Sequence, residues 1–355
     1  MAVIRMMQMC LDMVLLEAAY REKGIVICPR HPRKAESKSS SSRVALARHC
    51  CLRYILGMYH QVRRRVLVLV NPKSGLRSSF DSMRRAIDNA FDTAGTDLSY
   101  QFSQSAEDGI AKARRAIDKN IDIVLAVGGD GTISTIGREL IGSSIALGAI
   151  PTGSGNGFAR HFGIPMSPEK AVDALASGST MDIDVGAADD TPFLVTCSMA
   201  WEAAIAESFA KSPVRGILPY VFAGMHEFFD YTPQDLEVVL DGGAPMRFKA
   251  PMICTVANLS QFGGGAKIAP NARANDDHLE LVIALRQDLA KLIANIGRLF
   301  DGSLQTIPEV QSFRFKDLIV RRSRATPIQI DGELVQAGAE VHVSVESDKL
   351  KVLVP

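Results

Sequence analysis

The apolar residues of the chain follow different patterns in three successive stretches. Residues 1–60 show no consistent period. From Arg65 to about Met181, continuous apolar runs alternate with amphipathic stretches, whereas short strand-like runs dominate beyond Met181. Strands that alternate with helices are typical of a parallel sheet, and successive short strands are typical of a sandwich. The pattern predicts an α/β domain followed by a β-rich domain.

The first half contains repeated strand-loop-helix units. Strands are expected at Val66–Val70, Ile121–Val127 and Ile145–Ile150, and helices at Ser79–Ala90, Glu107–Asn120, from Thr132 to Leu140, and from Pro168 to Gly178 with Ser167 as N-cap. Each of these strands ends in a loop of small and polar residues, at 71–75, 128–132 and 151–157. Ligands of open α/β sheets bind at the carboxyl ends of the strands, so the loops predict a ligand site there.

The second half reads mostly as strands. They are expected at Phe193–Cys197, Leu236–Leu240, Ile253–Ala257, Leu279–Leu285, Ser312–Val320, Ile328–Ile330, Val341–Val345 and Leu350–Leu353, with one helix at Asp288–Phe300. We therefore predict four parts: an extension at 1–60, an α/β nucleotide-binding domain at 61–183, a β-rich domain at 184–330 and a C-terminal segment at 331–355.

The loop after the second strand carries the chemistry that most restricts function. Gly128, Gly129 and Gly131 lack the Cβ atoms that would hold a ligand away from the backbone, so their amides can approach oxyanions. Asp130 is the one charged residue among them. A carboxylate there would repel a phosphate unless a cation or a transferable proton lies between them. The loop indicates a site for nucleotide and Mg²⁺, although a tight turn without ligand also fits this short motif.

Composition favours a cytoplasmic protein. The 355 residues are 47% hydrophobic and 22% charged, as in ordinary globular proteins. Arg5, Asp12 and Glu17 interrupt the apolar N-terminus, so we expect no secretory signal. The six cysteines show no metal-ligand spacing and are expected to be reduced.

Charge separates the N-terminal arm from the body. Residues 1–65 carry 13 Lys/Arg and 4 Asp/Glu, hence +9, whereas the remaining 27 Lys/Arg and 35 Asp/Glu give −8. A basic arm favours anionic lipid, and nucleic acid is not expected because the acidic body would repel it. A short helix at Leu11–Ala19 is expected within the arm. Met58 precedes the first strand closely, so a start assigned too far upstream stays an alternative to a real arm.

Five ordered motifs carry a resemblance that covers residues 64–355. They are NPKSG at 71–75, GGDGT at 128–132, PTGSGNGFAR at 151–160, GGGAKIAPNARANDDHLEL at 263–281 and DGE at 331–333. In their order and spacing, they resemble the diacylglycerol kinase catalytic domain family, which includes soluble bacterial lipid kinases, sphingosine kinases and ceramide kinases.

The resemblance implies ATP in a cleft of the α/β domain, a β-sandwich that accepts a lipid, and a C-terminal segment that returns to the first domain. Mg²⁺ is the implied cofactor. By position, the nucleotide site would be lined by Asn71, Lys73, Ser74, Gly75, Gly128, Gly129, Gly131, Thr132, Ser154 and Asn156.

The resemblance also implies the catalytic groups. Asp331 and Glu333 match a pair that deprotonates the lipid hydroxyl, although DGE also fits a simple hairpin turn, a less favoured alternative. Asp130 would either join the Mg²⁺ network or act on the acceptor. A structural Mg²⁺ would bind Asp277 and the main-chain oxygens of Ala274 and Leu279.

Several positions depart from the bacterial diacylglycerol kinase pattern. Gly157 replaces a usual Asp, Ser134 and Thr135 replace Asn-Glu, and His278 replaces a common Gly beside the structural metal. The GSGN loop resembles the sphingosine and ceramide branch instead. A looser match, from Ser198 to Trp201, would place Glu202 or Glu207 near a lipid amine.

We therefore expect an ATP- and Mg²⁺-dependent kinase that phosphorylates a primary hydroxyl of diacylglycerol or a sphingoid base, transiently at the inner face of the membrane. An NAD kinase would share GGDGT but leaves DGE and GSGN unexplained, and a nucleotide-binding module without catalysis is a third hypothesis. The aromatic residues between Trp201 and Tyr231 suit core packing or a homodimer face better than a lipid pocket. His161 is expected to be a helix-end residue.

Overall fold

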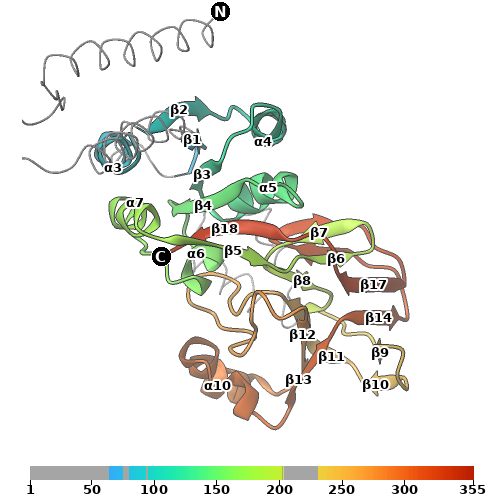
Figure 1. The fold of residues 1–355 in the computed structure, drawn as a ribbon. Helices are drawn as coiled ribbons and strands as arrows, with labels where there is room; N and C mark the ends of the chain where they lie inside the picture. Colours follow the sequence, from blue (N-terminus) through green and yellow to red (C-terminus); the bar gives the residue numbers. More distant parts are fainter. Residues whose placement is uncertain (1–63, 75–79, 93–94, 202, 204–230) are drawn as a thin grey trace, which may run out of the picture. The chain divides into compact units, whose positions relative to one another are not determined.

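The computed structural model describes residues 64–74, 80–92, 95–201, 203 and 231–355 (Figure 1). Several predictions concern residues outside this part of the chain. They are the basic extension with its helix at Leu11–Ala19, Gly75, Glu202, Glu207 and most of the aromatic-rich segment.

A six-stranded sheet in the order β2-β1-β3-β4-β18-β5 forms the first domain. Strands β1 to β4 are parallel, and β18 runs parallel to β4 and antiparallel to β5. The central strand β3 is buried at every position, as expected of a strand covered on both faces. The strands are β1 (Arg64–Val70), β2 (Thr96–Phe102), β3 (Ile123–Gly128), β4 (Ala146–Pro151), β5 (Ser179–Ile183) and β18 (Leu350–Val354).

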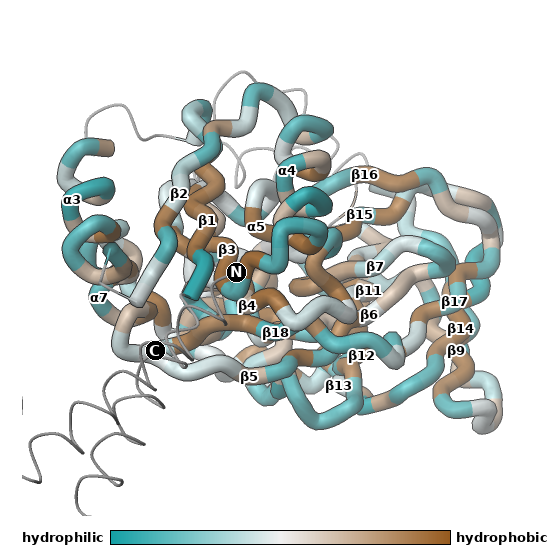
Figure 2. Tube along the Cα trace, turned by 45° about the horizontal axis from the view of Figure 1, so that its top comes forward, coloured by the Kyte–Doolittle hydropathy of each residue, from teal (hydrophilic) through white to brown (hydrophobic). Residues whose placement is uncertain are grey.

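Helices cover both faces of this sheet (Figure 2). Helices α3 (Phe80–Phe91) and α7 (Pro168–Ala176) pack together on one face, and α4 (Ala106–Asp118) and α5 (Asp130–Leu140) pack together on the other. The short helix α6 (Gly157–His161) follows β4. The apolar pattern predicted β1, β3 and β4 but missed β2 and β5. Both missed strands are polar and partly exposed because they form the two edges of the sheet.

The second domain is a sandwich of two antiparallel sheets, ordered β10-β9-β14-β17-β6-β7 and β13-β12-β11-β8-β15-β16. Apolar side chains of both sheets form its core, among them Val238, Val341, Val256 and Leu281. The first sheet contains β6 (Gly186–Ala188), β7 (Thr191–Phe193), β9 (Leu236–Leu240), β10 (Met246–Phe248), β14 (Asp317–Arg322) and β17 (Glu340–Val345). The second contains β8 (Thr196–Ser198), β11 (Pro251–Ala257), β12 (Leu279–Leu285), β13 (Val310–Phe315), β15 (Ile328–Ile330) and β16 (Glu333–Val335). The predicted fold class, an α/β domain followed by a β-sandwich, is confirmed.

One helix and one 3₁₀ turn accompany the sandwich. Helix α10 (Leu289–Asp301) begins after Asp288, whose carboxylate accepts the Lys291 amide at 2.8 Å, and it ends at Gly302 with φ of 85°. The 3₁₀ turn η2 (Leu304–Thr306) follows and contributes Leu304 to a small apolar cluster. Both helix ends thus carry residues that commonly cap helices, Asp at the start and Gly at the end.

Two predicted strands are each divided between the two sheets of the sandwich. The run Ser312–Val320 breaks between β13 and β14, where Asp241 Oδ1 accepts the amides of Lys316 and Asp317 at 2.9 Å each. The run Phe193–Cys197 breaks between β7 and β8. In both places a carboxylate that is distant in the sequence, Asp241 or Asp331, accepts the backbone amides that would otherwise have continued the strand pairing. Local strand propensity cannot indicate such a break.

Within the C-terminal segment at 331–355, the last strand is the part that joins the sheet of the first domain. Val352 and Leu353 of β18 pair with Leu147 and Gly148 of β4, whereas β16 and β17 belong to the sandwich. Strand β18 therefore lies between β4 and β5 and brings residues from the far end of the chain into the α/β sheet.

Candidate active site

Three loops meet at the carboxyl ends of β1, β3 and β4. The Asn71 side-chain amide donates to Thr132 Oγ1 at 2.8 Å, and the Ser74 and Thr152 hydroxyls lie 2.9 Å apart. The Thr152 amide donates to the carbonyl of Gly128 at 2.9 Å. These bonds join the NPKSG, GGDGT and PTGSGNG segments into one polar surface at the sheet edge where ligands of α/β proteins bind.

The glycines of this surface have two different roles. A Cβ on Gly153 would lie 2.7 Å from Gly129 Cα, and one on Gly128 would lie 2.4 Å from the Thr132 side chain, so these glycines permit the loops to pack together. Gly131, in contrast, is exposed and would have no atom within 4 Å of its Cβ. It lies in the first turn of α5, where helix amides point outward and the helix dipole favours anions. The open space at Gly131 is suited to a phosphate.

The other predicted nucleotide residues differ in exposure. Lys73 and Ser154 are exposed on their loops. Asn156 is buried, with φ of 55°, and its side-chain oxygen and nitrogen both bond to the backbone of Gly153, at 3.1 and 2.8 Å. Its side chain therefore fixes the loop conformation.

Asp130 is the first residue of α5 and lies against the beginning of α6. Its carboxylate accepts the Phe158 amide at 3.4 Å. Burial raises the pKa of Asp130, and the nearby Asp331 charge adds to this rise, while the amides of Phe158, Asn156 and Gly157 oppose it. A carboxylate with a raised pKa and some solvent exposure is a better proton acceptor than an ordinary surface aspartate.

Gly157 leaves no room for the aspartate that bacterial diacylglycerol kinases usually carry there. A Cβ at this position would lie 2.7 Å from the carbonyl oxygen of Phe262 and 2.9 Å from that of Gln261. Both are backbone atoms, which cannot move aside cheaply. The Asp130 carboxylate therefore lies at the beginning of α6 without a second carboxylate at position 157.

The DGE segment is a hairpin turn, and its aspartate is buried. Asp331 and Gly332 have φ of 48° and 92° and connect β15 to β16, in which Ile330 pairs with Glu333. Asp331 Oδ1 accepts the amides of Val195 and Thr196, at 2.8 and 3.1 Å. Its Oδ2 accepts the Leu194 amide at 2.9 Å and Arg138 Nη2 at 3.2 Å.

These four donors occupy the four lone-pair positions of the Asp331 carboxylate, whose side chain is only 1% exposed. They also explain the break between β7 and β8. Glu333, the other member of the predicted pair, is 56% exposed and contacts Arg138 at 3.3 Å. The two carboxylates therefore have different surroundings, and Asp331 has the contacts of a positioning group.

Arg138 was not singled out from the sequence. It lies on α5 eight residues after Asp130, two helical turns along the same face, and bonds to Asp331, Glu333 and the carbonyl of Ile330. It thereby ties the helix that carries Asp130 to the DGE hairpin. Its partners lie more than 190 positions away in the sequence, so no local spacing marks Arg138.

The predicted structural metal site contains a lysine. Lys349 Nζ contacts both Asp184 Oδ1 and Asp277 Oδ1, and it lowers the pKa of Asp277. The Ala274 carbonyl accepts the Asp184 amide at 2.6 Å. Among the described residues, no group of at least three His, Cys, Asp or Glu side chains forms a potential metal cluster.

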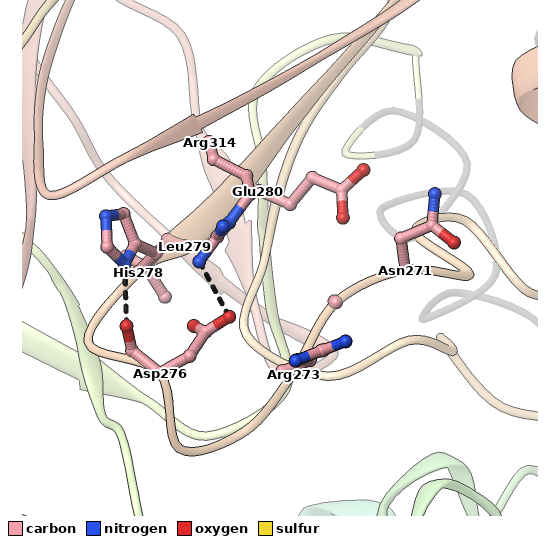
Figure 3. Close-up of a pocket in the computed structure, with 8 residues that line it drawn as sticks. Asn271, Arg273, Asp276, His278, Leu279, Glu280 and Arg314 are labelled. Atoms are coloured by element: carbon pink, nitrogen blue, oxygen red, sulfur yellow. Dashed lines mark hydrogen bonds and ion pairs between the residues drawn. The ribbon is translucent and has the colours of Figure 1, made fainter.

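The neighbouring Asp276 is held separately (Figure 3). Its carboxylate accepts Arg314 Nη2 at 2.7 Å, and its carbonyl lies 2.6 Å from His278 Nδ1. His278, the departure from the family pattern, thus bonds to its own loop.

His161, at the end of α6, accepts the Ser260 amide through Nδ1 at 3.0 Å. The ring must stay unprotonated at Nδ1 to accept this bond, and burial lowers its pKa from 6.5 to about 4. His161 is therefore neutral at pH 7 and holds α6 to the following domain.

This geometry predicts acid-sensitive stability. As the pH falls from about 6.5 to about 4, the unfolded chain binds a proton at His161 that the folded chain does not, so stability that is complete above pH 6.5 is lost. The loss in the free energy of unfolding should reach about 2 kcal/mol. This is less than the full shift of the His161 pKa implies, because solvent screens the partly exposed ring. Urea unfolding at pH 7.5 and 4.5 should show a smaller difference for His161→Asn, which keeps an acceptor but not the titration. An unchanged difference would contradict this role.

The remaining candidates lie in the sandwich interior. Ser198 bonds to Thr255 at 2.9 Å, and both side chains are buried. Cys197 and Cys254 are buried, and neither is part of a disulfide. Within the part of the chain that the structure describes, no helix is both long and apolar enough to cross a bilayer.

Comparisons with known proteins agree with this architecture. Residues 65–188 match the model of the diacylglycerol kinase catalytic domain, and residues 196–354 match that of the YegS C-terminal NAD kinase beta sandwich-like domain. A crystal structure of a diacylglycerol kinase from Bacillus anthracis str. Sterne has a TM-score of 0.63 at 18% identity, over 82% of this chain and 97% of that one. At this identity, the likeness shows the fold alone.

Sequence relatives extend the comparison. Diacylglycerol kinase of Mycobacterium tuberculosis is 30% identical over 275 residues, which cover 73% of this chain and 87% of that protein. Diacylglycerol kinase of Bacillus subtilis is 26% identical over 307 residues, covering 82% and 99%. A protein named probable lipid kinase YegS-like from Chromohalobacter salexigens is 28% identical over 271 residues, covering 73% and 85%. The chain therefore belongs to the diacylglycerol kinase and YegS-like family of lipid kinases.

Proposed function

We propose that this protein transfers the γ-phosphate of ATP to a primary hydroxyl of a membrane lipid, either a diacylglycerol or a sphingoid base. Family membership supports a phosphotransferase. The observation that carries the proposal is the hydrogen-bonded meeting of the three loops, in which Thr132 follows the open position Gly131 and Asp130 precedes it. Phosphoryl transfer depends mainly on positioning and charge neutralisation, and this surface offers amides, hydroxyls and the exposed Lys73 for both.

Asp130 is the group to which we assign the acceptor's proton. It is adjacent to the proposed phosphate site, and its pKa is raised by burial. Asp331, whose lone pairs are all engaged, holds the DGE hairpin and Arg138 in place and adds negative charge near Asp130. In this assignment Asp130 is the base and Asp331 a positioning residue, while Glu333 is the second carboxylate to test.

The residues present fit a Mg²⁺ ion that accompanies ATP. The Thr132 and Ser74 hydroxyls are hard oxygen donors on the same surface, of the kind that Mg²⁺ prefers. When bound, the ion would neutralise charge on the transferred phosphate. Because Mg²⁺ keeps several waters and binds nucleotide phosphates, a complete protein cage is not required.

Labelled ATP offered with separate acceptors tests the proposal. Purified protein is incubated with Mg²⁺, γ-labelled ATP and mixed micelles of diacylglycerol, monoacylglycerol, sphingosine or ceramide, or with NAD in solution. We expect label in one lipid class and none in NAD. Label in NAD would identify an NAD kinase. ATP binding without transfer to any acceptor would identify a nucleotide-binding module without catalysis, and either result would overturn the proposal.

A further inference from the structure

A lysine and two aspartates from distant parts of the sequence meet where the two domains join. Asp184 follows β5, Asp277 precedes β12 and Lys349 precedes β18. The Lys349 ammonium contacts a carboxylate oxygen of each aspartate. Strands β5 and β18 belong to the α/β sheet and β12 belongs to the sandwich, so this cluster links the two domains.

Asp184 is the member of the cluster that needs a cation. Its side chain is only 1% exposed, whereas Asp277 is 64% exposed. Asp184 Oδ2 accepts the amides of Asp276 and Asp277, at 2.9 and 2.8 Å, and this leaves Oδ1 to the Lys349 ammonium. A buried carboxylate without a compensating cation would strongly destabilise the fold.

The loop that begins at Ala274 is shaped by the same aspartate. The Asp184 amide donates to the Ala274 carbonyl at 2.6 Å, while its side chain binds two amides further along the loop. Asp277 has φ of 56°, in the left-handed region that aspartate tolerates better than most residues with side chains. Asp184 and Lys349 thus both bind this loop directly.

The expected structural Mg²⁺ does not fit beside this ammonium. A Mg²⁺ bound to Asp277 would lie about 2 Å from a carboxylate oxygen. The oxygen Oδ1 of Asp277 already contacts Lys349 Nζ, so the divalent ion and the ammonium would be neighbouring like charges. The Arg314 guanidinium, which bonds to the adjacent residue Asp276, is a second positive group in contact with the same loop. The lysine and the metal are therefore alternatives.

We propose that the Lys349 ammonium permanently replaces the structural metal ion, so that the junction between the two domains is independent of divalent cations. The proposal concerns folding stability and does not depend on the proposed reaction. A built-in cation needs no supply from solution, and it couples the last strand of the chain directly to the loop before β12.

Thermal unfolding without nucleotide or lipid tests this proposal. The variant Lys349→Met removes the charge at nearly constant length, and Lys349→Arg keeps it. Lys351→Met is the matched control, because Lys351 lies two residues further on, in β18, and pairs at 2.7 Å with Asp182, which is 59% exposed. Each protein is measured in EDTA and in millimolar Mg²⁺.

For wild type, Lys349→Arg and Lys351→Met, we expect each protein to unfold at the same temperature in EDTA as in Mg²⁺. In EDTA, Lys349→Met should unfold roughly 8 °C below wild type, and Mg²⁺ should restore at least half of this loss. A wild-type midpoint that falls in EDTA would overturn the proposal. So would Lys349→Met with an unchanged midpoint, or with a loss that Mg²⁺ does not restore. Failure of lipid phosphorylation would affect none of these readings.

Discussion

Replacing Asp130 with asparagine should lower the turnover number for lipid phosphorylation by about 10³-fold, which is within the range attributed to a positioned general base. Asparagine keeps an oxygen that can accept the Phe158 amide, so the loop should keep its shape. Asp122→Asn is the matched control. Asp122 lies just before β3, at the other end of the strand from Asp130, and its carboxylate accepts the Arg65 amide. Initial rates at saturating ATP and lipid measure the effect.

The pH profile distinguishes a proton acceptor from a metal ligand. Burial raises the pKa of Asp130 above the ordinary 3.8. At pH values below this raised pKa, the wild-type rate should fall tenfold per pH unit, because the protonated carboxyl group cannot accept the proton. Asp130→Asn should not show this fall in rate at acidic pH. If high Mg²⁺ restores the activity of Asp130→Asn, the carboxylate serves the metal and the assignment as base is wrong.

Replacing Asp331 with asparagine should destabilise the protein by about 3 kcal/mol, because it leaves buried donors and the Arg138 charge without their acceptor. In the native protein, both oxygens of the Asp331 carboxylate accept hydrogen bonds from these donors. In the variant, the NH₂ group of asparagine replaces one of these oxygens, so its hydrogens would face the backbone amides at 194–196 or the Arg138 guanidinium. Urea unfolding at pH 7.5 measures the loss.

Glu333→Gln provides the control for Asp331. The Glu333 side chain is 56% exposed, and its one ion pair among the described residues is with Arg138 at 3.3 Å. The loss in the free energy of unfolding should therefore stay below about 1 kcal/mol. Equal and small losses for the two variants would show that the carboxylate of Asp331 does not hold the hairpin. Turnover of Glu333→Gln, measured in parallel, tests whether this glutamate takes part in catalysis.

Local sequence was sufficient to predict the loop surface. Apolar β-branched runs identify buried strands, and glycines and polar residues at their carboxyl ends locate the site, because parallel strands bring these ends to one edge. Gly131 and Asp130 could be selected in this way. Strands β2 and β5 could not, since edge strands carry polar residues that resemble those of loops.

Contacts distant in sequence were beyond prediction. Arg138 bonds to a residue 193 positions away, and Lys349 bonds to one 165 positions away, so nothing in their neighbourhoods indicated a partner. DGE had two compatible interpretations, a catalytic pair and a hairpin. The hairpin is confirmed by the backbone, while the surroundings of Asp331 became visible only once β7 and β8 were placed around it.

The most direct test of lipid phosphorylation is to measure ADP and phosphorylated lipid together, by mass spectrometry, in one reaction with unlabelled ATP and the lipid acceptor. Wild type should form the two products in equal amounts, and Asp130→Asn should form both about 10³-fold more slowly. ADP without phosphorylated lipid, or phosphorylated lipid formed equally fast by Asp130→Asn, would contradict the proposed site.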